Sequence, residues 1–199
     1  MTSRADTRKQ LRARRRALNH HERQHRSQAV CRQLARQPLF RNSRRIALYL
    51  PADGEVDTAP LLELAWRLGK QVYLPVLVPG MENRLWFVRY RPDTRLVSNR
   101  FGIAEPERVH RQRIDIRGMD LVLTPLVGFD GHGNRLGMGG GFYDRSLAFL
   151  LHRRYWCKPR LVGLAYDFQQ LTELPAEAWD VPLSAVVTDT GWHHFHIKK

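Results

Sequence analysis

Apolar residues are sparse in the first part of the chain and recur there at helical spacing. Leu11 lies among arginines in a stretch that predicts a helix from Thr7 to Leu18. Asn19 and Glu22 stand three residues apart, as in a capping box, and predict the start of a second helix. Pro38 is expected at or just past the end of that helix, because proline cannot continue the hydrogen-bond ladder.

Short apolar runs follow, and they alternate with amphipathic segments. A short apolar run between turn residues is typical of a buried strand. Helices are expected over residues 58–68, with Thr58 as the cap, and from Tyr143 to about Arg153. Residues 91–118 are expected to be mostly loop. Strands are expected at residues 46–50, 72–77, 85–90, 121–127, 161–166 and 185–188.

This alternation of strands and helices predicts an α/β fold. We expect a single domain over residues 1–199, with a largely parallel sheet flanked by helices on both faces and a basic helical part at residues 1–45. Ligands of such sheets bind beyond the carboxyl ends of the strands. The segment that follows residues 121–127 is therefore where a ligand is expected.

Length and composition are those of an ordinary globular protein, with 43% apolar residues among 199. No apolar run approaches the ~20 residues that span a bilayer, and the N-terminus lacks the apolar region of a signal peptide. The two cysteines, Cys31 and Cys157, lack metal-binding spacing, which argues against a disulfide framework and against a thiol nucleophile. These features predict a cytoplasmic protein that does not enter a membrane.

Positive charge is concentrated at the N-terminus. The formal net charge is +14, of which residues 1–45 carry +12. Such an arm is one signature of nucleic-acid binding. The alternative is a solvated helical face with a few arginines directed at a small anionic ligand. We favour the alternative, because no aromatic residue that could stack on a base precedes Phe40. Nucleic-acid binding is expected to be weak and non-specific at most, and the protein is expected to be a monomer.

The segment Arg135–Arg145 carries the strongest chemical signal. Its glycines at 137, 139, 140 and 141 allow several backbone N–H groups to turn toward one point, which suits a phosphate. Asp144 follows at once and is a candidate Mg²⁺ ligand. The segment is neither a P-loop, because it contains no lysine, nor a dinucleotide fingerprint, because Phe142 stands at the third glycine position. The plain alternative is a tight turn that joins a strand to a helix.

The same segment resembles the signature of the 5-formyltetrahydrofolate cyclo-ligase family, with Phe142 in place of a frequent tyrosine. Three further segments resemble motifs of that family and occur in the family's order. They are the basic motif Arg8-Lys9-Gln10-Leu11-Arg12, the acidic motif Glu55-Val56-Asp57-Thr58, and Phe101-Gly102-Ile103-Ala104-Glu105-Pro106.

The resemblance implies an enzyme that uses ATP and Mg²⁺ to convert 5-formyltetrahydrofolate to 5,10-methenyltetrahydrofolate through a phosphorylated formyl group. Arg135, Tyr143 and Asp144 would be catalytic, and Asp144 would hold Mg²⁺. The implied ATP contacts are Arg8, Lys9, Arg12, Arg135, Leu136, Gly137, Met138, Gly139, Gly140, Gly141, Phe142 and Tyr143. The implied folate contacts are Glu55, Asp57, Phe101, Met138, Gly139, Gly140, Gly141 and Phe142.

Plain structural roles remain open for several of these residues. Asp144 could instead face a helix dipole, Asp57 or Thr58 could cap a helix, and Phe101 could belong to the core. A sugar-phosphate isomerase or an acyl-CoA enzyme shares the family's fold, but no motif of either class is found here.

One position departs from the family pattern. The family tends to place a second acidic residue near the metal where Ser184 stands, and Asp180 or Asp189 are candidates to compensate. The tail His193-His194-x-His196 has metal-like spacing, but we expect a surface segment there, as we do for His132 in a glycine-flanked turn.

Overall fold

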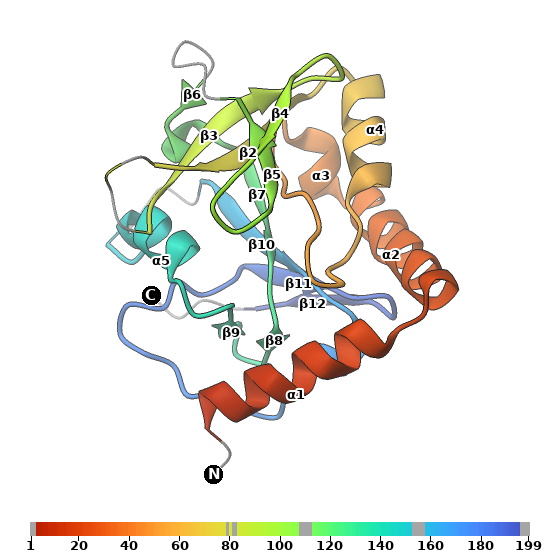
Figure 1. Ribbon diagram of the computed structural model, residues 1–199, viewed down its shortest axis with the longest axis vertical. Helices are drawn as coiled ribbons and strands as arrows, with labels where there is room; N and C mark the ends of the chain where they lie inside the picture. Colours follow the sequence, from red (N-terminus) through yellow and green to blue (C-terminus); the bar gives the residue numbers. More distant parts are fainter. Residues whose placement is uncertain (1–2, 79, 81–82, 108–112, 153–157, 196–199) are drawn as a thin grey trace.

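The computed structural model describes residues 3–78, 80, 83–107, 113–152 and 158–195. Its centre is an eight-stranded sheet whose five middle strands are parallel and whose edge strands are antiparallel (Figure 1). The order across the sheet is β12 (Trp192–His194), β11 (Ala185–Val187), β10 (Arg160–Leu164), β7 (Leu121–Pro125), β1 (Arg45–Ala47), β2 (Gln71–Leu77), β3 (Leu85–Tyr90) and β6 (Arg113–Ile114).

Both faces of the sheet are buried, because successive side chains of a strand point to opposite sides. In β7, Leu121 and Leu123 belong to one apolar cluster and Val122 to the other. The first cluster is covered by α2 (His20–Ala35), α3 (Pro38–Asn42) and α4 (Ala59–Arg67), and the second by α5 (Phe142–Leu147) and the short 3₁₀ helices η2 (Ile116–Gly118) and η3 (Ala148–Leu150) (Figure 1). The predicted α/β fold with helices on both faces is confirmed.

Local signals near the N-terminus placed most boundaries correctly. The helix predicted at residues 7–18 is α1 (Arg4–Ala17), and the predicted capping box at Asn19 and Glu22 is present at the start of α2. Pro38 lies past the end of α2 but also begins α3, where its missing N–H costs nothing. Thr58 is the residue before α4, yet its hydroxyl donates to the Tyr49 carbonyl at 2.6 Å, and Asp57 supplies the side-chain cap.

Other predictions differ from the structure. The helix expected from Tyr143 to Arg153 gives way to η3 after Leu147, and the Ser146 hydroxyl donates back to the Phe142 carbonyl at 2.7 Å, a bond that weakens a helical ladder. Arg153 lies outside the described residues. The stretch 91–118 contains the strand pair β4 (Leu96–Ser98) and β5 (Ala104–Pro106), and the predicted histidine tail contributes the edge strand β12.

Strand order places a crevice between β1 and β7. The chain leaves β1 toward β2 on one side, and from β7 it continues to β10 on the other, so the loops after these two strands diverge. The loop after β7 first forms the hairpin of β8 (Gly128–Phe129) and β9 (Arg135–Leu136), and the glycine loop, residues 137–141, follows. Helix α1 lies beside this hairpin (Figure 1), with the Leu11 side chain against Gly128.

The sheet leaves no room for a side chain at Gly163 in β10. A Cβ there would lie 2.5 Å from the Leu126 side chain and 3.0 Å from Leu183. We expect Gly163→Ala to lower the free energy of unfolding by about 1–3 kcal/mol through overpacking. Urea denaturation measures this loss, and Gly191→Ala is the control, because no atom lies within 4 Å of its added Cβ. Equal stability of the two variants would contradict the packing seen here.

No helix in the described part of the chain is long and apolar enough to span a bilayer.

Candidate active site

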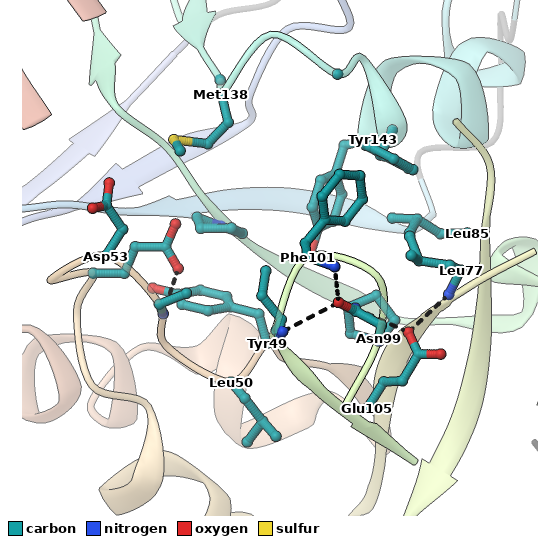
Figure 2. A pocket seen from close by; sticks show the side chains of 18 of the residues that line it. Tyr49, Leu50, Asp53, Leu77, Leu85, Asn99, Phe101, Glu105, Met138 and Tyr143 are labelled. Atoms are coloured by element: carbon teal, nitrogen blue, oxygen red, sulfur yellow. Dashed lines mark hydrogen bonds between the residues drawn. The ribbon is translucent and has the colours of Figure 1, made fainter. Parts of the chain in front are cut away.

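A cavity of about 690 Å³ opens at the carboxyl ends of β1 and β7 (Figure 2). Its lining comes from the turn after β1, from β2 and the start of β3, from the loop between β4 and β5, from the end of β7, from Arg135 and the glycine loop with the start of α5, and from Arg12 of α1. Figure 2 shows Met138 and Phe101 on either side of the space, with Tyr49 below Met138. Apolar side chains dominate the lining, and four carboxylates join them: Asp53, Glu55, Glu105 and Asp144.

The turn after β1 is fixed against α1. Asp53 and Gly54 both have positive φ, 51° and 75°, as the centre of a type I′ turn requires. The Glu55 amide donates to the Ala52 carbonyl at 3.0 Å and closes the turn. A Cβ at Gly54 would lie 3.2 Å from the Arg15 carbonyl oxygen, so glycine permits the close approach of the turn to the helix.

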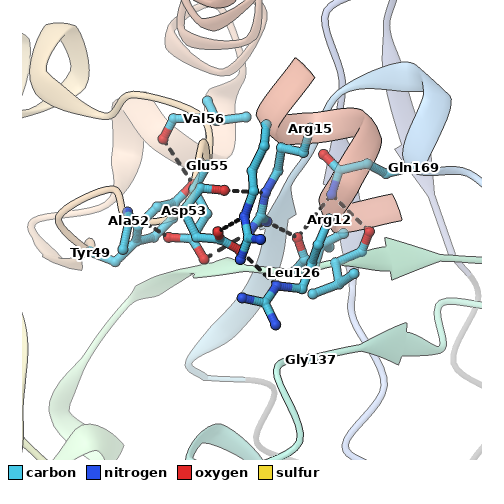
Figure 3. Close-up of polar contacts among 12 residues, drawn as sticks. Arg12, Arg15, Tyr49, Ala52, Asp53, Glu55, Val56, Leu126, Gly137 and Gln169 are labelled. Atoms are coloured by element: carbon cyan, nitrogen blue, oxygen red, sulfur yellow. Dashed lines mark hydrogen bonds and ion pairs between the residues drawn. The ribbon is translucent and has the colours of Figure 1, made fainter. Parts of the chain in front are cut away.

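The Asp53 carboxylate accepts hydrogen bonds from three guanidinium groups of α1 (Figure 3). Arg12 Nε donates to Asp53 Oδ2 at 2.8 Å, Arg15 Nη2 donates to the same oxygen at 2.9 Å, and Arg16 Nε donates to Oδ1. Burial opposes ionisation of Asp53, but these three partners outweigh it and lower the pKa of its carboxyl to about 2. The carboxylate is therefore charged at every physiological pH.

Arg8 and Arg12 present free guanidinium edges to the cavity side of α1. Arg8 Nε donates to the Gly137 carbonyl at 2.8 Å, and Arg12 uses its Nε for Asp53. The Nη groups of both side chains find no acceptor among the described residues. Arg8 lies over the glycine loop, since a Cβ at Gly139 would be 3.9 Å from its Cζ. Two forks on one helix face, each held by its Nε, suit the oxygens of a phosphate.

The glycine loop has unused donors. Gly139 and Gly141 have φ of 101° and 63°, and a Cβ at Gly140 would lie 2.6 Å from the Phe142 ring. None of the backbone N–H groups of residues 137–141 donates to an acceptor in the described part of the protein. Backbone donors without partners, next to two free guanidinium edges, form an anion site.

Asp144 is held at the entrance of α5 by a buried arginine. Arg135 Nη2 donates to Asp144 Oδ1 at 2.5 Å, and the Val181 amide donates to the same oxygen at 3.1 Å. Arg135 Nη1 donates to the Val181 carbonyl at 2.5 Å, and the residue is 6% exposed. Oδ2 of Asp144 has no partner among the described residues.

Glu55 lies on the opposite wall and is almost fully buried. Its Oε2 accepts from the Ala52 amide at 3.1 Å, and Arg15 Nη1 lies 3.9 Å from its Oε1. Burial raises the pKa of Glu55 to about 7, although the positive charge of Arg15 acts in the opposite direction. Burial together with the charge of Glu55 also raises the pKa of the Tyr143 and Tyr49 hydroxyls, so both are neutral donors at pH 7.

The loop between β4 and β5 brings Phe101 over the cavity. Asn99 Oδ1 accepts from the amides of Phe101 and Ile103, and its Nδ2 donates to buried Glu105 at 3.1 Å. Glu105 also accepts from the Leu77 amide of β2 at 3.2 Å, which ties the loop to the main sheet. Phe101 is 56% exposed and meets the Phe142 ring edge to face at 5.8 Å, so it is not a core residue.

Comparison with known proteins gives a consistent result. The model of the 5-formyltetrahydrofolate cyclo-ligase family matches residues 1–189. A 5-formyltetrahydrofolate cyclo-ligase of Escherichia coli K12 is 46% identical over 89% of this chain and 96% of its own length. The chain belongs to the 5-formyltetrahydrofolate cyclo-ligase family. The Haemophilus influenzae cyclo-ligase is 48% identical over 72% of this chain and 74% of its own length.

Two solved structures share the fold of this cyclo-ligase family member. The 5,10-methenyltetrahydrofolate synthetase of Aquifex aeolicus superposes with a TM-score of 0.81 at 34% identity and covers 98% of this chain and 94% of its own. The synthetase of Mycoplasma pneumoniae gives a TM-score of 0.73 at 26% identity, with 94% and 99% covered. The family predicted from the four motifs is confirmed, and so is the prediction that the protein is an enzyme of this family.

The fold of this family member brings most of the predicted site residues to one cavity. Those that line it are Arg12, Glu55, Phe101, Arg135, Gly137, Met138, Gly140, Gly141, Phe142, Tyr143 and Asp144. Arg8 reaches the same place through the Gly137 carbonyl, whereas Lys9 beside it is exposed to solvent. Gly139 contributes only backbone, and Leu136 is buried in β9.

Asp57 does not line the cavity with Glu55. Its Oδ1 accepts from the Ala59 amide at 3.0 Å, and its own amide donates to Ser27. The helix-capping alternative is therefore the role the structure gives to Asp57.

Neither Asp180 nor Asp189, the candidates to compensate for Ser184, lines the cavity. The backbone amide of Ser184 donates to the Leu161 carbonyl of β10. Asp180 pairs with Arg4 at 3.0 Å, and Asp189 pairs with Arg26 at 2.5 Å. His132 is exposed and His193 and His194 lie in the edge strand β12; His196 and Cys157 are outside the described residues. No group of three metal-ligand side chains occurs among the described residues.

Sequence reasoning missed two residues that shape this site, Asp53 and Arg15. Arg15 is not among the arginines that the motifs single out, but it is 1% exposed and contacts Asp53 and Leu126. The Asp53-Gly54 pair is a turn signal that could have identified the type I′ turn. Arg15 stands four residues after Leu11 and three before Leu18, and this spacing could have placed it, unlike Arg14 and Arg16, on the inner face of the helix.

Proposed function

We propose that this protein cyclises 5-formyltetrahydrofolate to 5,10-methenyltetrahydrofolate with consumption of Mg·ATP. The observation that carries the proposal is the anion site between α1 and the glycine loop. Backbone N–H groups without acceptors and two free guanidinium edges meet there, at the mouth of a largely apolar cavity. The anion site suits a phosphate chain, and the apolar cavity suits a flat aromatic substrate.

The chemistry explains why both ligands must meet. The formyl oxygen takes the γ-phosphoryl group of ATP, the bond between the β,γ-bridging oxygen and the γ-phosphorus breaks, and ADP departs. The N10 amine then attacks the formyl carbon and loses its proton, and the carbon–oxygen bond breaks to release phosphate. The protein contributes mainly position and charge neutralisation, as in other phosphoryl transfers.

On the nucleotide side, Arg8, Arg12 and the backbone of residues 137–141 would bind the triphosphate. Asp144 fits a Mg²⁺ that travels with ATP, because Oδ2 is free at the cavity wall while Oδ1 is fixed by Arg135. A single carboxylate is typical of Mg²⁺ sites completed by substrate phosphates and water. When bound, the ion would neutralise phosphate charge. Arg135 would act by holding Asp144, since both of its Nη groups are occupied.

On the folate side, Glu55 would accept hydrogen bonds from the amino group and ring N–H of the pterin. The Phe101 ring, together with Met138 across the cavity, would cover the flat ring systems (Figure 2). The neutral Tyr143 hydroxyl lies near Glu55 and would donate to an oxygen of the substrate.

A direct assay tests the proposal. With Mg²⁺, ATP and 5-formyltetrahydrofolate, the protein is expected to form the methenyl product, which is followed by its near-ultraviolet absorption. Omission of ATP, or replacement of Mg²⁺ by a chelator, is expected to abolish the signal. Folded protein that yields no chromophore from fresh substrate would refute the proposal.

An RNA-binding role for the basic arm is the competing hypothesis. Arg8, Arg12 and Arg15 each donate to loops that line the cavity, which supports the enzyme. We expect RNA association that is weak and is lost between about 50 and 200 mM salt, because each phosphate contact releases counterions. Selective RNA binding that resists 200 mM salt would favour the alternative.

A further inference from the structure

Arg15 is a fully buried cation that no assigned role explains. It is 1% exposed and contacts two loops at once (Figure 3). Its Nε donates to the Asp53 carbonyl at 2.8 Å, its Nη2 to the Asp53 carboxylate at 2.9 Å, and its Nη1 to the Leu126 carbonyl at 3.2 Å. Arg15 thus links α1 to the loops that follow β1 and β7, which are the two sides of the crevice.

Neutralisation of Asp53 does not require Arg15. Arg12 and Arg16 both bind the same carboxylate, so three positive charges face one negative charge. Arg15 also lies near a second carboxylate, because its Nη1 is 3.9 Å from Oε1 of Glu55. In a buried site, an opposite charge at this distance strongly favours the ionised carboxylate.

Two cations of α1 favour a charged Glu55, and Arg15 has the larger effect. Charged and titratable groups that face Glu55 come from α1, from its own turn, from the segment after β1, from α5 and from the segment after β10. They are Arg15 and Arg12, Asp53, Tyr49, Tyr143, and Tyr166, whose hydroxyl donates to the Glu55 carbonyl at 3.3 Å. Arg12 donates through Nε to Asp53, and the three tyrosines are neutral, so Arg15 is the main group that favours a charged Glu55.

We propose that Arg15 is a positioning residue for the folate half of the site: it keeps Glu55 charged and directed into the cavity while it fixes the two crevice loops. The proposal rests on the proposed function, in which Glu55 accepts hydrogen bonds from the pterin. A protonated Glu55 would lose an acceptor oxygen and present a donor to the pterin N–H groups, so the substrate would bind poorly.

The pH dependence follows from this assignment. The pKa of Glu55 is about 7 with Arg15 present, so the acceptor form predominates above pH 7 and is lost as pH falls. Removal of the positive charge raises that pKa further. The fall in folate affinity at acidic pH, here called the acid limb, then begins at a higher pH. In the wild type, affinity for 5-formyltetrahydrofolate is expected to fall about tenfold per pH unit below the midpoint.

The experiment measures the dissociation constant of 5-formyltetrahydrofolate without ATP, over about pH 5.5–8.5, together with kcat/KM over the same range. For Arg15→Gln we expect the midpoint of the acid limb to rise by about one pH unit or more. Arg15→Lys keeps a charge without the planar fork, and its midpoint is expected to lie close to that of the wild type. Arg16→Gln is the matched control, because Arg16 binds the same Asp53 but makes no contact with Glu55; its midpoint is expected to equal that of the wild type.

Glu55→Gln separates this inference from the proposed function. We expect it to weaken folate binding at least tenfold at pH 8 and to abolish the acid limb. If Glu55→Gln leaves folate binding unchanged, the folate assignment of the proposed function fails. If Glu55→Gln has its expected effect but the Arg15 variants keep the wild-type midpoint, Arg15 is a structural residue only and the inference is wrong. Should Arg15→Gln not fold, Arg15→Met, which fills the buried site without a charge, is measured in its place: a raised midpoint supports the inference, and a midpoint equal to that of the wild type shows a purely structural role.

Discussion

Asp144→Asn is expected to lower turnover by about 100-fold or more, the scale seen when one electrostatic stabiliser is removed from an active site. The substitution keeps the shape of the side chain but removes the charge that would hold Mg²⁺ beside the phosphates. It also leaves Arg135 opposite a neutral amide, so urea denaturation of the variant must accompany the kinetics. Turnover is measured as a function of Mg²⁺ concentration at saturating ATP.

Asp180→Asn is the control for this variant. Asp180 lies on the segment that Arg135 contacts, and it pairs with Arg4, yet it does not line the cavity. We expect the control to keep turnover within a few fold. Near-normal turnover of Asp144→Asn at low Mg²⁺ would show that Asp144 serves only as the partner of Arg135 and of the Val181 amide.

The double variant Arg8→Ala, Arg12→Ala is expected to raise the KM for ATP by about 100-fold, because charge-assisted hydrogen bonds to phosphate contribute about 1.5–3 kcal/mol each. The KM for the folate is expected to change little, since other segments hold that substrate. Initial-rate kinetics with each substrate varied at saturation of the other measures both constants.

Lys9→Ala is the control, because Lys9 lies between the two arginines in sequence and is exposed to solvent. A rise in KM for ATP in this control as large as that of the double variant would point to general electrostatic attraction by the basic arm. An unchanged KM for ATP in the double variant, with selective RNA binding lost instead, would overturn the assignment of α1 to the nucleotide.

The cap at Asn19, the end of α2 ahead of Pro38 and the buried strands were accessible from the sequence because each depends on neighbours a few residues apart. The edge strand β12 was not, since it pairs with β11 and its three residues carry no alternation of their own. The short length of α5 could not be predicted from the sequence either. A serine whose hydroxyl bonds to the preceding turn cannot be told, in the sequence, from any other polar residue of a helix.

The sequence by itself determined the family and the glycine loop, since both depend on residue types at fixed short spacing. Only the tertiary structure decided what the buried arginine of α1 contacts. Leu11 and Leu18 mark an inner face of that helix on which Arg15 lies, but the contacts of Arg15 are with residues 38 and 111 positions away, beyond the reach of a local pattern. The same holds for Glu55 and Asp57: both are acidic residues of one short segment, and a left-handed turn pressed against α1 directs one to the cavity and leaves the other to cap α4.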